Sequence, residues 1–351
     1  MFYKCPQCQK VWQYSIQKCP ECFVKLERLE SKNIKVLGVS KVTVPTIMHP
    51  ITPYFALVLE DDNENRWAYK SVKEYNVGDD FVIESSDDKD AVAIWRIKYD
   101  ILEAIEKVLS LIKDVEIKGN SKILILPTLL EAKHPYLSYN TTPQFLAGII
   151  QFLIKKGANP KNIKVASQSF DHTPIEASVT KSQLLKVCQN SQTTPLNLAK
   201  TKFIKKEVGN FSFEVSEEFF QNDLIINLPI LNLDSKIKVR GAAENILKCL
   251  KKESYLSAKY LYSYEDILVN LQKVLPNYLT LGEAMSIQKQ DKHVARLGLV
   301  LASFNPFHVD RIFAKITGTE CLPKHLKNVD LEKIIIVGRK IKEVEYNVDE
   351  F

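Results

Sequence analysis

Glycine is scarce in this chain and never takes the spacing of a phosphate-binding loop. The 351 residues include 11 glycines, and no Gly-x-Gly pair occurs. The glycine-rich turns that cradle phosphates are therefore missing, which excludes the dinucleotide fingerprint and the P-loop. The Gly-x-Ser-x-Gly elbow of α/β hydrolases and the His-Glu-x-x-His zinc motif are absent as well. The common motifs of four enzyme classes are thereby excluded.

Long apolar runs are also missing. The nearest candidate, residues 145–154, is far shorter than the roughly 18 residues that a membrane span needs. No apolar export segment precedes the first cysteine, so we expect a cytoplasmic protein without a membrane partner.

The charge balance says little about partners. Lysine and arginine total 48 against 42 acidic residues, which gives a net charge of +6. The basic residues are spread in small lysine clusters, and no arginine-rich arm exists. This pattern permits nucleic-acid binding but does not favour it, because solvated lysine faces explain it equally well.

Four of the seven cysteines lie within the first twenty-two residues, as the pairs Cys5–Cys8 and Cys19–Cys22. Two Cys-x-x-Cys pairs can supply a tetrahedral four-thiolate shell for one ion, and zinc is the first choice. Iron in a rubredoxin-like site uses the same ligands, and two disulfides would use the same residues. The other three cysteines stand at no motif spacing, which suits a reducing compartment and favours the metal.

The chain divides into four predicted regions. Residues 1–30 form a zinc ribbon, which is too small to fold without its ion. Residues 31–90 hold short strand-like runs separated by turn residues, which predicts a small OB-like β-barrel. A helix at 97–113 makes 91–118 a linker, and 119–351 form a larger domain.

The larger domain alternates strand and helix patterns. Apolar runs at 122–126, 163–166 and 223–228 predict buried strands, and the periodicity at 142–156 and 306–316 predicts helices. Further helices are expected at 174–188, 239–250 and 264–274, and further strands at 297–302 and 334–337. This order predicts an α/β domain with a mainly parallel sheet, whose functional residues follow the carboxyl ends of the strands.

Polar residues follow these predicted strands. Asp171 and His172 are candidates for an acid–base pair, and Asn232, Asp234 and Glu244 are weaker catalytic candidates. Helix capping and surface polarity are the commoner roles for such residues. Further candidates for ligand binding are Thr128, Ser167, Ser169, Asn245 and Asp310.

The first ~90 residues resemble the zinc-ribbon and OB-fold proteins of domain-of-unknown-function family 35. The resemblance rests on the two cysteine pairs and on residues 52–60 and 76–82. It implies an accessory role beside acyl-CoA enzymes such as thiolases. Where that family often has glycine after each cysteine pair, this chain has Gln9 and Phe23.

Residues 122–338 resemble domain-of-unknown-function family 362. The matching stretches are 123–128, 141–143, 156–158, 226–229, 241–245 and 301–310. Typical members place lysine and asparagine where this chain has Leu126 and Thr128, a Lys-Thr-His triplet at 232–234, and lysine at Glu244. The resemblance thus implies a cationic cleft that has become neutral or acidic here, so that its chemistry differs or is lost.

The leading hypothesis is a cytoplasmic accessory or substrate-handling protein that binds a partner protein or a small polar or acyl ligand. One alternative is an active enzyme whose cleft uses the candidates after the strands. Another is a nucleic-acid-binding module, in which Tyr54, Phe55, Trp67 and Tyr69 of the barrel stack on bases.

Overall fold

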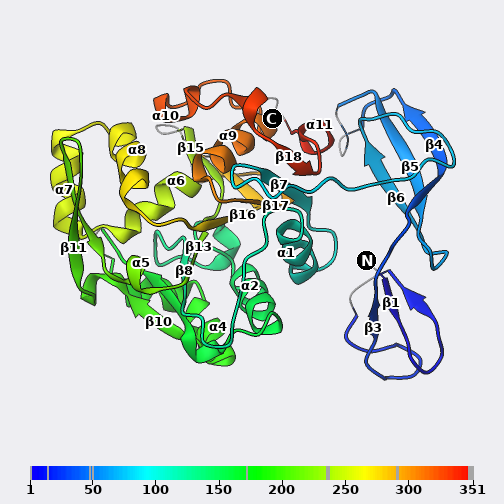
Figure 1. Ribbon diagram of the computed structural model, residues 1–351, viewed down its shortest axis with the longest axis horizontal. Coiled ribbons are helices and arrows are strands. Elements are labelled where there is room, and N and C mark those ends of the chain that lie inside the picture. The colour runs from blue at the N-terminus through cyan, green and yellow to red at the C-terminus, as the bar shows by residue number, and fades with distance from the viewer. Residues whose placement is uncertain are drawn as a thin grey trace.

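The computed structural model describes residues 2–13, 16–46, 49, 51–170, 173–234, 238–289 and 292–346, with backbone alone at 289 and 292–294. Two small sheets lie side by side at one end of the molecule, and one large sheet with its helices makes up the rest (Figure 1). Within these residues, no helix is both long enough and apolar enough to cross a bilayer.

The N-terminal sheet is small and antiparallel, in the order β2-β1-β3. Its strands are β1 (Phe2–Lys4), β2 (Val11–Trp12) and β3 (Glu27–Leu29). Two or three residues per strand bury little apolar surface, and the buried cluster here consists of two cysteines and Leu26. Such a unit depends on something other than its core for stability.

The second sheet has the antiparallel order β4-β5-β6. Its strands are β4 (Lys35–Val42), β5 (Tyr54–Glu60) and β6 (Arg66–Ser71). The barrel predicted for 31–90 is not confirmed: the described residues there form this three-stranded sheet, to which those after β6 add one isolated bridge, between Lys35 and Asp80. Tyr54 and Tyr69, which were candidates for base stacking, are 9% and 8% exposed.

The large sheet is mainly parallel, as predicted, and antiparallel where β17 pairs with β16 and β7 and where β14 pairs with β15. In spatial order its strands are β10 (Thr194–Asn197), β9 (Ile163–Ser167), β8 (Ile123–Pro127), β13 (Leu224–Leu228), β16 (Leu279–Lys289), β17 (Lys292–Ser303), β7 (Val92–Arg96) and β18 (Ile336–Gly338). The short strands β14 (Asn232–Asp234) and β15 (Lys238–Arg240) extend it beside β16, and β11 (Phe203–Val208) and β12 (Phe211–Ser216) form a separate hairpin.

Helices cover both faces of this sheet, which explains why the central strand β8 is apolar and buried at every position. In β8, Ile123 and Ile125 pack on one side, and Leu124 and Leu126 pack on the other. The first face is covered by α1 (Ile101–Leu109), α2 (Pro143–Lys155), α3 (Ile175–Lys181) and α4 (Leu184–Ser191). The second is covered by α5 (Glu218–Gln221), α6 (Ala242–Asn245), α7 (Lys252–Leu261), α8 (Tyr264–Val274), α9 (Pro306–Ile316), α10 (Lys324–Lys327) and α11 (Ile341–Val344).

Three predicted helices differ from the observed ones. The segment 91–118 contains α1, but it opens with β7, a strand of the large sheet. The helix expected at 174–188 is divided in two at Gln183, whose φ is 64°. The helix expected at 239–250 is instead the end of β15, the short α6 and a 3₁₀ turn. Periodicity could not show these breaks, because the apolar positions keep their spacing across them.

Candidate functional site

The four N-terminal cysteines come together as the sequence predicts. Their sulfur atoms all lie within 4.8 Å of one another, and the four thiols are free of disulfides. The Sγ atoms of Cys8 and Cys19 are 3.7 Å apart. A tetrahedron with metal–sulfur bonds of about 2.3 Å has edges of about 3.8 Å, so the quartet fits one ion. This group is a candidate metal centre.

The two Cys-x-x-Cys loops share one backbone geometry. In each, the N–H of the first cysteine donates to the carbonyl five residues later, and the N–H four residues later donates back to that cysteine's carbonyl, at 2.8–2.9 Å. The residue after the second cysteine has a positive φ, 62° at Gln9 and 56° at Phe23. Glycine adopts this conformation most easily, which fits the glycine often found there in the family that the N-terminal residues resemble. The departures change the residue but keep the turn.

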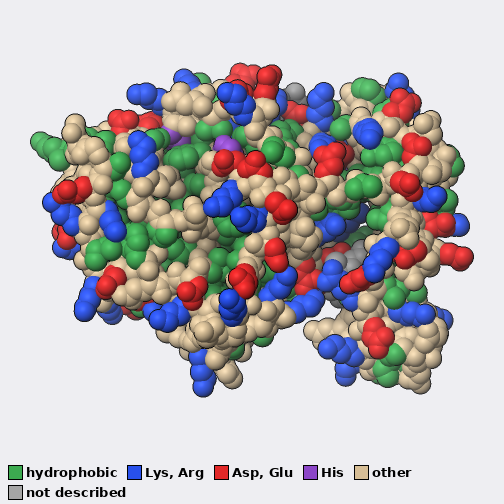
Figure 2. Space-filling view, viewed as in Figure 1, with side chains coloured by type: hydrophobic (Ala, Val, Ile, Leu, Met, Phe, Trp, Pro, Cys, Tyr) green, Lys and Arg blue, Asp and Glu red, His purple; other side chains and the backbone are tan. Residues whose placement is uncertain are grey.

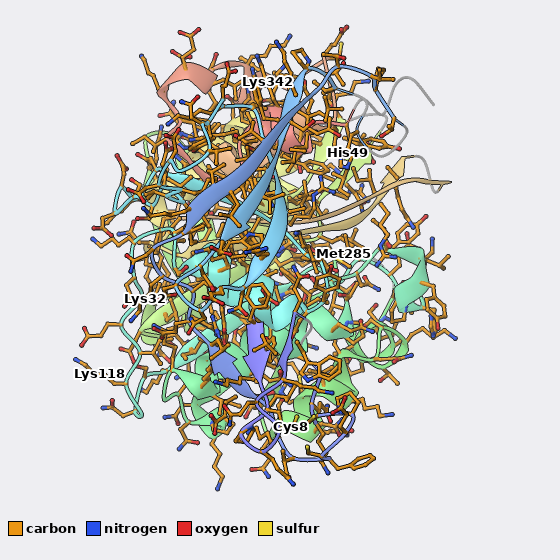
Figure 3. All side chains as sticks on the ribbon, turned by 90° about the vertical axis from the view of Figure 1, so that its right-hand side faces the viewer. Cys8, Lys32, His49, Lys118, Met285 and Lys342 are labelled. Carbon is orange, nitrogen blue, oxygen red and sulfur yellow. The ribbon has the colours of Figure 1, made fainter. Side chains whose placement is uncertain are left out.

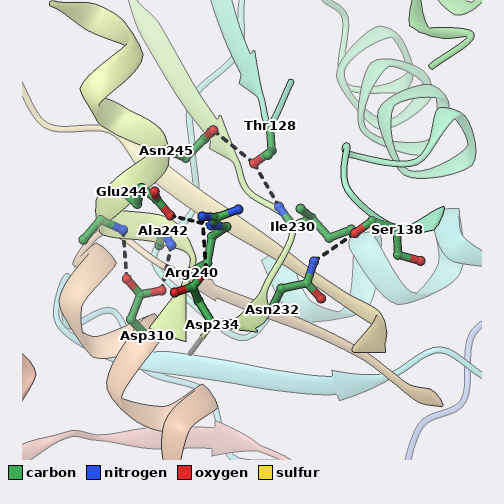
Figure 4. Close-up of polar contacts among 11 residues, drawn as sticks. Thr128, Ser138, Ile230, Asn232, Asp234, Arg240, Ala242, Glu244, Asn245 and Asp310 are labelled. Carbon is green, nitrogen blue, oxygen red and sulfur yellow. Dashed lines mark hydrogen bonds and ion pairs between the residues drawn. The ribbon is translucent and has the colours of Figure 1, made fainter. Parts of the chain in front are cut away.

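A second group of polar side chains lies where β8 and β13 end (Figure 4). The Thr128 hydroxyl donates to Asn245 Oδ1 at 3.0 Å and accepts from the Ile230 N–H at 3.1 Å. Asn245 Nδ2 donates to the Leu126 carbonyl and to Asn227 Oδ1, both at 2.8 Å. Thr128 and Asn245 are thus in contact. Their polar atoms, however, join β8, β13 and α6 to one another.

Asp310 also joins two elements of the fold, α9 and α6. It lies within α9, 2% exposed, and accepts hydrogen bonds from the Ala242 N–H at 2.6 Å and the Ala243 N–H at 2.9 Å. Burial raises the pKa of Asp310 to about 7, and these two N–H groups oppose that rise. A Cβ on Gly241 would lie 2.2 Å from Asp310 Oδ1, so glycine is required for this approach. The carboxyl group fastens the first turn of α6 to α9.

The remaining described candidates are spread along the same edge. Asn232 donates to the Ser138 carbonyl at 2.8 Å and accepts from the Gln288 N–H at 2.9 Å. Ser167 is 2% exposed and ends β9, and Ser169 is half-buried in the loop after it. Asp171 and His172 lie outside the described residues.

The polar side chains that retain exposure at this edge form an ion-pair cluster. Arg240 Nη2 lies 3.2 Å from Asp234 Oδ2, and Arg240 Nε lies 3.3 Å from Glu244 Oε2. The three side chains are 35%, 24% and 24% exposed in the order Arg240, Asp234, Glu244. Burial raises the pKa of Glu244, and the charge of Arg240 opposes that rise. Arg240 Nε and Glu244 Oε2 make no well-formed hydrogen bond with the described residues.

One buried acid escaped the sequence analysis. Glu283 is fully buried in β16 and accepts hydrogen bonds from the Thr142 N–H at 2.9 Å and the Thr142 hydroxyl at 2.7 Å. It therefore holds the N-terminus of α2 against the sheet. A single acidic residue within the apolar run 279–284 was the available signal, since such a residue needs a partner when buried.

Stability should fall as the pH rises because of Glu283. Burial raises its pKa from 4.5 to about 7, so the folded state binds more protons than the unfolded state between these values. The free energy of unfolding then decreases with pH, by up to about 1.4 kcal/mol per pH unit for one group. Urea unfolding between about pH 5 and pH 8 measures this slope. Glu283→Gln should make it shallower. A variant with the wild-type slope would show that Glu283 does not titrate in this window.

The comparisons with known proteins match the larger domain. The family described as "Domain of unknown function (DUF362)" matches residues 123–315. No curated protein matches the chain. The structure of the lactate racemase apoprotein from Thermoanaerobacterium thermosaccharolyticum aligns at 10% identity with a TM-score of 0.38, over 66% of this chain and 58% of that chain. The family-35 resemblance of the N-terminal residues stays a prediction. Because the family match covers more than half of its residues, the chain belongs to the DUF362 family.

Proposed function

We propose that this protein is an accessory, ligand-binding protein rather than a catalyst. The observation behind the proposal is that most described candidate side chains at the sheet edge form their hydrogen bonds with other groups of the protein. Thr128, Asn245 and Asp310 hold strands and helices together and are at least 95% buried. Groups held in this way cannot also serve a substrate without breaking the fold.

The cluster of Asp234, Arg240 and Glu244 is the proposed ligand site at this edge. Its side chains keep partial exposure, and the contact between Arg240 Nε and Glu244 leaves hydrogen-bonding capacity unused. A small polar molecule that both donates and accepts hydrogen bonds would pair with the exposed ends of these side chains, since Arg240 Nε and Glu244 Oε2 are themselves buried. The two carboxylates around one guanidinium disfavour a strongly anionic ligand, in keeping with the loss of the family's cationic residues.

The N-terminal quartet is proposed to hold one structural zinc ion. Four thiolates complete a tetrahedral shell and leave no open position for a substrate, which is the pattern of a structural zinc site. Free thiols persist in a reducing compartment, so we propose a cytoplasmic location. The OB-like module with this ribbon would then recognise a partner protein. Nucleic-acid binding is less favoured, since Tyr54 and Tyr69 present little ring surface.

The ligand site can be tested by thermal unfolding with small hydroxy-acid, amino-acid and amide probes. A probe that binds only the folded state at about 100 times its Kd adds about 2.7 kcal/mol and raises the Tm by several degrees. This shift should be lost in Arg240→Gln and kept in Arg296→Gln, which removes the same charge at an exposed position of β17. A shift that survives Arg240→Gln would place the ligand elsewhere.

A second candidate function is catalysis by Glu244. Burial raises its pKa, as in general acids, and its side chain keeps 24% exposure. Conversion of a probe by the wild-type protein, and not by Glu244→Gln, would replace the binding proposal with this one.

A further inference from the structure

A cavity of about 390 Å³ lies between the N-terminal sheets and the large domain. Its walls come from the turn after β3, from β6, from the end of β7, from the start of α1 and from the residue after β18. Figure 2 shows a recess between the N-terminal lobe and the main body, and in Figure 3 Lys32 of the cavity wall lies above Cys8, toward the second sheet. Segments distant in sequence build this cavity.

An ion pair of Arg28 connects the N-terminal sheet to the large domain beside this cavity. Arg28 of β3 pairs with Glu106 of α1, and Glu106 also pairs with Lys155 of α2 at 2.6 Å. Arg28 lines the cavity. The ribbon therefore fixes one wall of a cavity whose other walls belong to the second sheet and the α/β domain.

Positive charge dominates the lining. Six cations line the cavity (Arg28, Lys32, Arg96, Lys98, Lys107 and Arg339) against three carboxylates (Glu30, Asp100 and Glu103). Arg28 and Lys32 have acidic partners, Glu106 and Glu30. Arg96, Lys98 and Lys107 make no ion pair within 4.0 Å in the part of the chain that is described. The unpaired cations thus lie on the α/β side.

Arg339 is a buried cation in this wall. It is 6% exposed, donates from Nη1 to the Lys70 carbonyl at 3.1 Å and lies 3.5 Å from Glu343. Its Nε–H is buried and has no hydrogen-bond partner among the described atoms. Burial of Arg96 and of Lys98 lowers the pKa of each, and the charge of Arg339 lowers both further. Like charges crowded in a partly dry site favour an anion between them.

Aromatic rings lie beside these cations. Trp67 and Trp95 are half-buried and line the cavity. The Arg339 guanidinium lies 3.7 Å from the centre of the Tyr69 ring and 5.4 Å from that of Trp95. Lys107 lies 5.6 Å from the Trp95 ring. Indole faces next to arginine groups are surfaces on which planar rings stack.

We propose that this cavity binds a nucleoside phosphate, with the base against Trp67 and Trp95 and the phosphate facing Arg96, Lys98 and Arg339. The volume lies within the range of small-molecule sites. This way of binding phosphate differs from that of glycine-rich loops, because side-chain cations take the place of backbone N–H groups. The site is separate from the Asp234–Arg240–Glu244 cluster, and the proposal goes beyond the function proposed above.

Tryptophan fluorescence of the full-length, metal-loaded protein tests this proposal, because two of the three tryptophans line the cavity. Titration with AMP and ATP should give a saturable change in fluorescence. Arg96→Gln should weaken binding by about tenfold or more, because a charge-assisted contact to phosphate is lost. Arg296→Gln, with the same charge change on an exposed strand position, should bind as the wild type does.

Adenosine and inorganic pyrophosphate test the base and the phosphate of the proposed ligand separately. Each should bind more weakly than AMP and ATP do. Pyrophosphate binding as tight as that of ATP would overturn the role of the aromatic wall, and adenosine binding as tight as that of AMP would overturn the role of the cations. No saturable change with either nucleotide would overturn the proposal. Lys98→Gln replaces Arg96→Gln if circular dichroism shows that the latter is unfolded.

Discussion

Replacing Cys19 with serine is expected to release the metal ion and to unfold residues 2–30, while the α/β domain stays folded. The ribbon buries two cysteines and Leu26, and its three strands have two or three residues each. Apolar burial of that size cannot offset the loss of chain entropy. Metal binding contributes about 10–16 kcal/mol in comparable four-ligand units, so the ion decides whether this unit folds.

Elemental analysis and limited proteolysis check this prediction. Wild-type protein should hold about one zinc ion per chain and resist cleavage within the ribbon. Cys19→Ser should lose the metal and be cut there, while the fragment with the large sheet remains resistant. Cys321→Ser is the matched control, because Cys321 is an exposed free thiol outside the quartet. A metal-free wild-type protein with a resistant N-terminus would contradict the ribbon, and one iron ion per chain would replace zinc.

Asp310→Ala should destabilise the α/β domain by about 3–4 kcal/mol. The substitution leaves the N–H groups of Ala242 and Ala243 buried without partners, and each costs about 1–3 kcal/mol. It also removes the link between α6 and α9. For a domain of this size, the Tm should fall by roughly 6–16 °C at about 2–4 °C per kcal/mol.

Urea unfolding at one pH measures this loss, and Asp87→Ala serves as a control because Asp87 is exposed. Gly241→Ala should have a comparable effect, since its Cβ would lie 2.2 Å from Asp310 Oδ1. If the free energy of unfolding of Asp310→Ala lies within about 1 kcal/mol of the wild-type value, the carboxyl group does not stabilise the contact between α6 and α9. It would then be available to bind a ligand.

Much of the α/β domain could be predicted from the sequence because its strands are buried on both faces. The runs predicted at 122–126, 163–166 and 223–228 are observed as β8, β9 and β13 within a residue at each end. The helix predicted at 306–316 is observed at those residues. The predictions of single helices at 174–188 and 239–250 were wrong, because the breaks at Gln183 and Gly241 depend on tertiary packing.

For the candidate residues at the sheet edge, the sequence predicts the position but not whether each side chain binds a ligand or stabilises the fold. Thr128 lies at this edge because β8 ends there, whereas Asn245 reaches it from α6, and Asp310 contacts α6 from α9, which follows the antiparallel strand β17. Whether each faces a ligand or the protein depends on its neighbours, and those neighbours come from segments as far apart as Leu126 and Asn245. No local pattern carries that information.

The sequence by itself determined the cysteine quartet and the α/β class of this protein. Both depend on short-range rules: two residues between paired cysteines, and apolar runs that alternate with helical periodicity. Only the tertiary structure decided that Asp310 and Asn245 fasten the fold, that Asp234, Arg240 and Glu244 keep exposure, and that six cations and two indoles meet in one cavity. The physical reason is that burial and charge crowding arise from contacts between distant segments, which residue spacing does not encode.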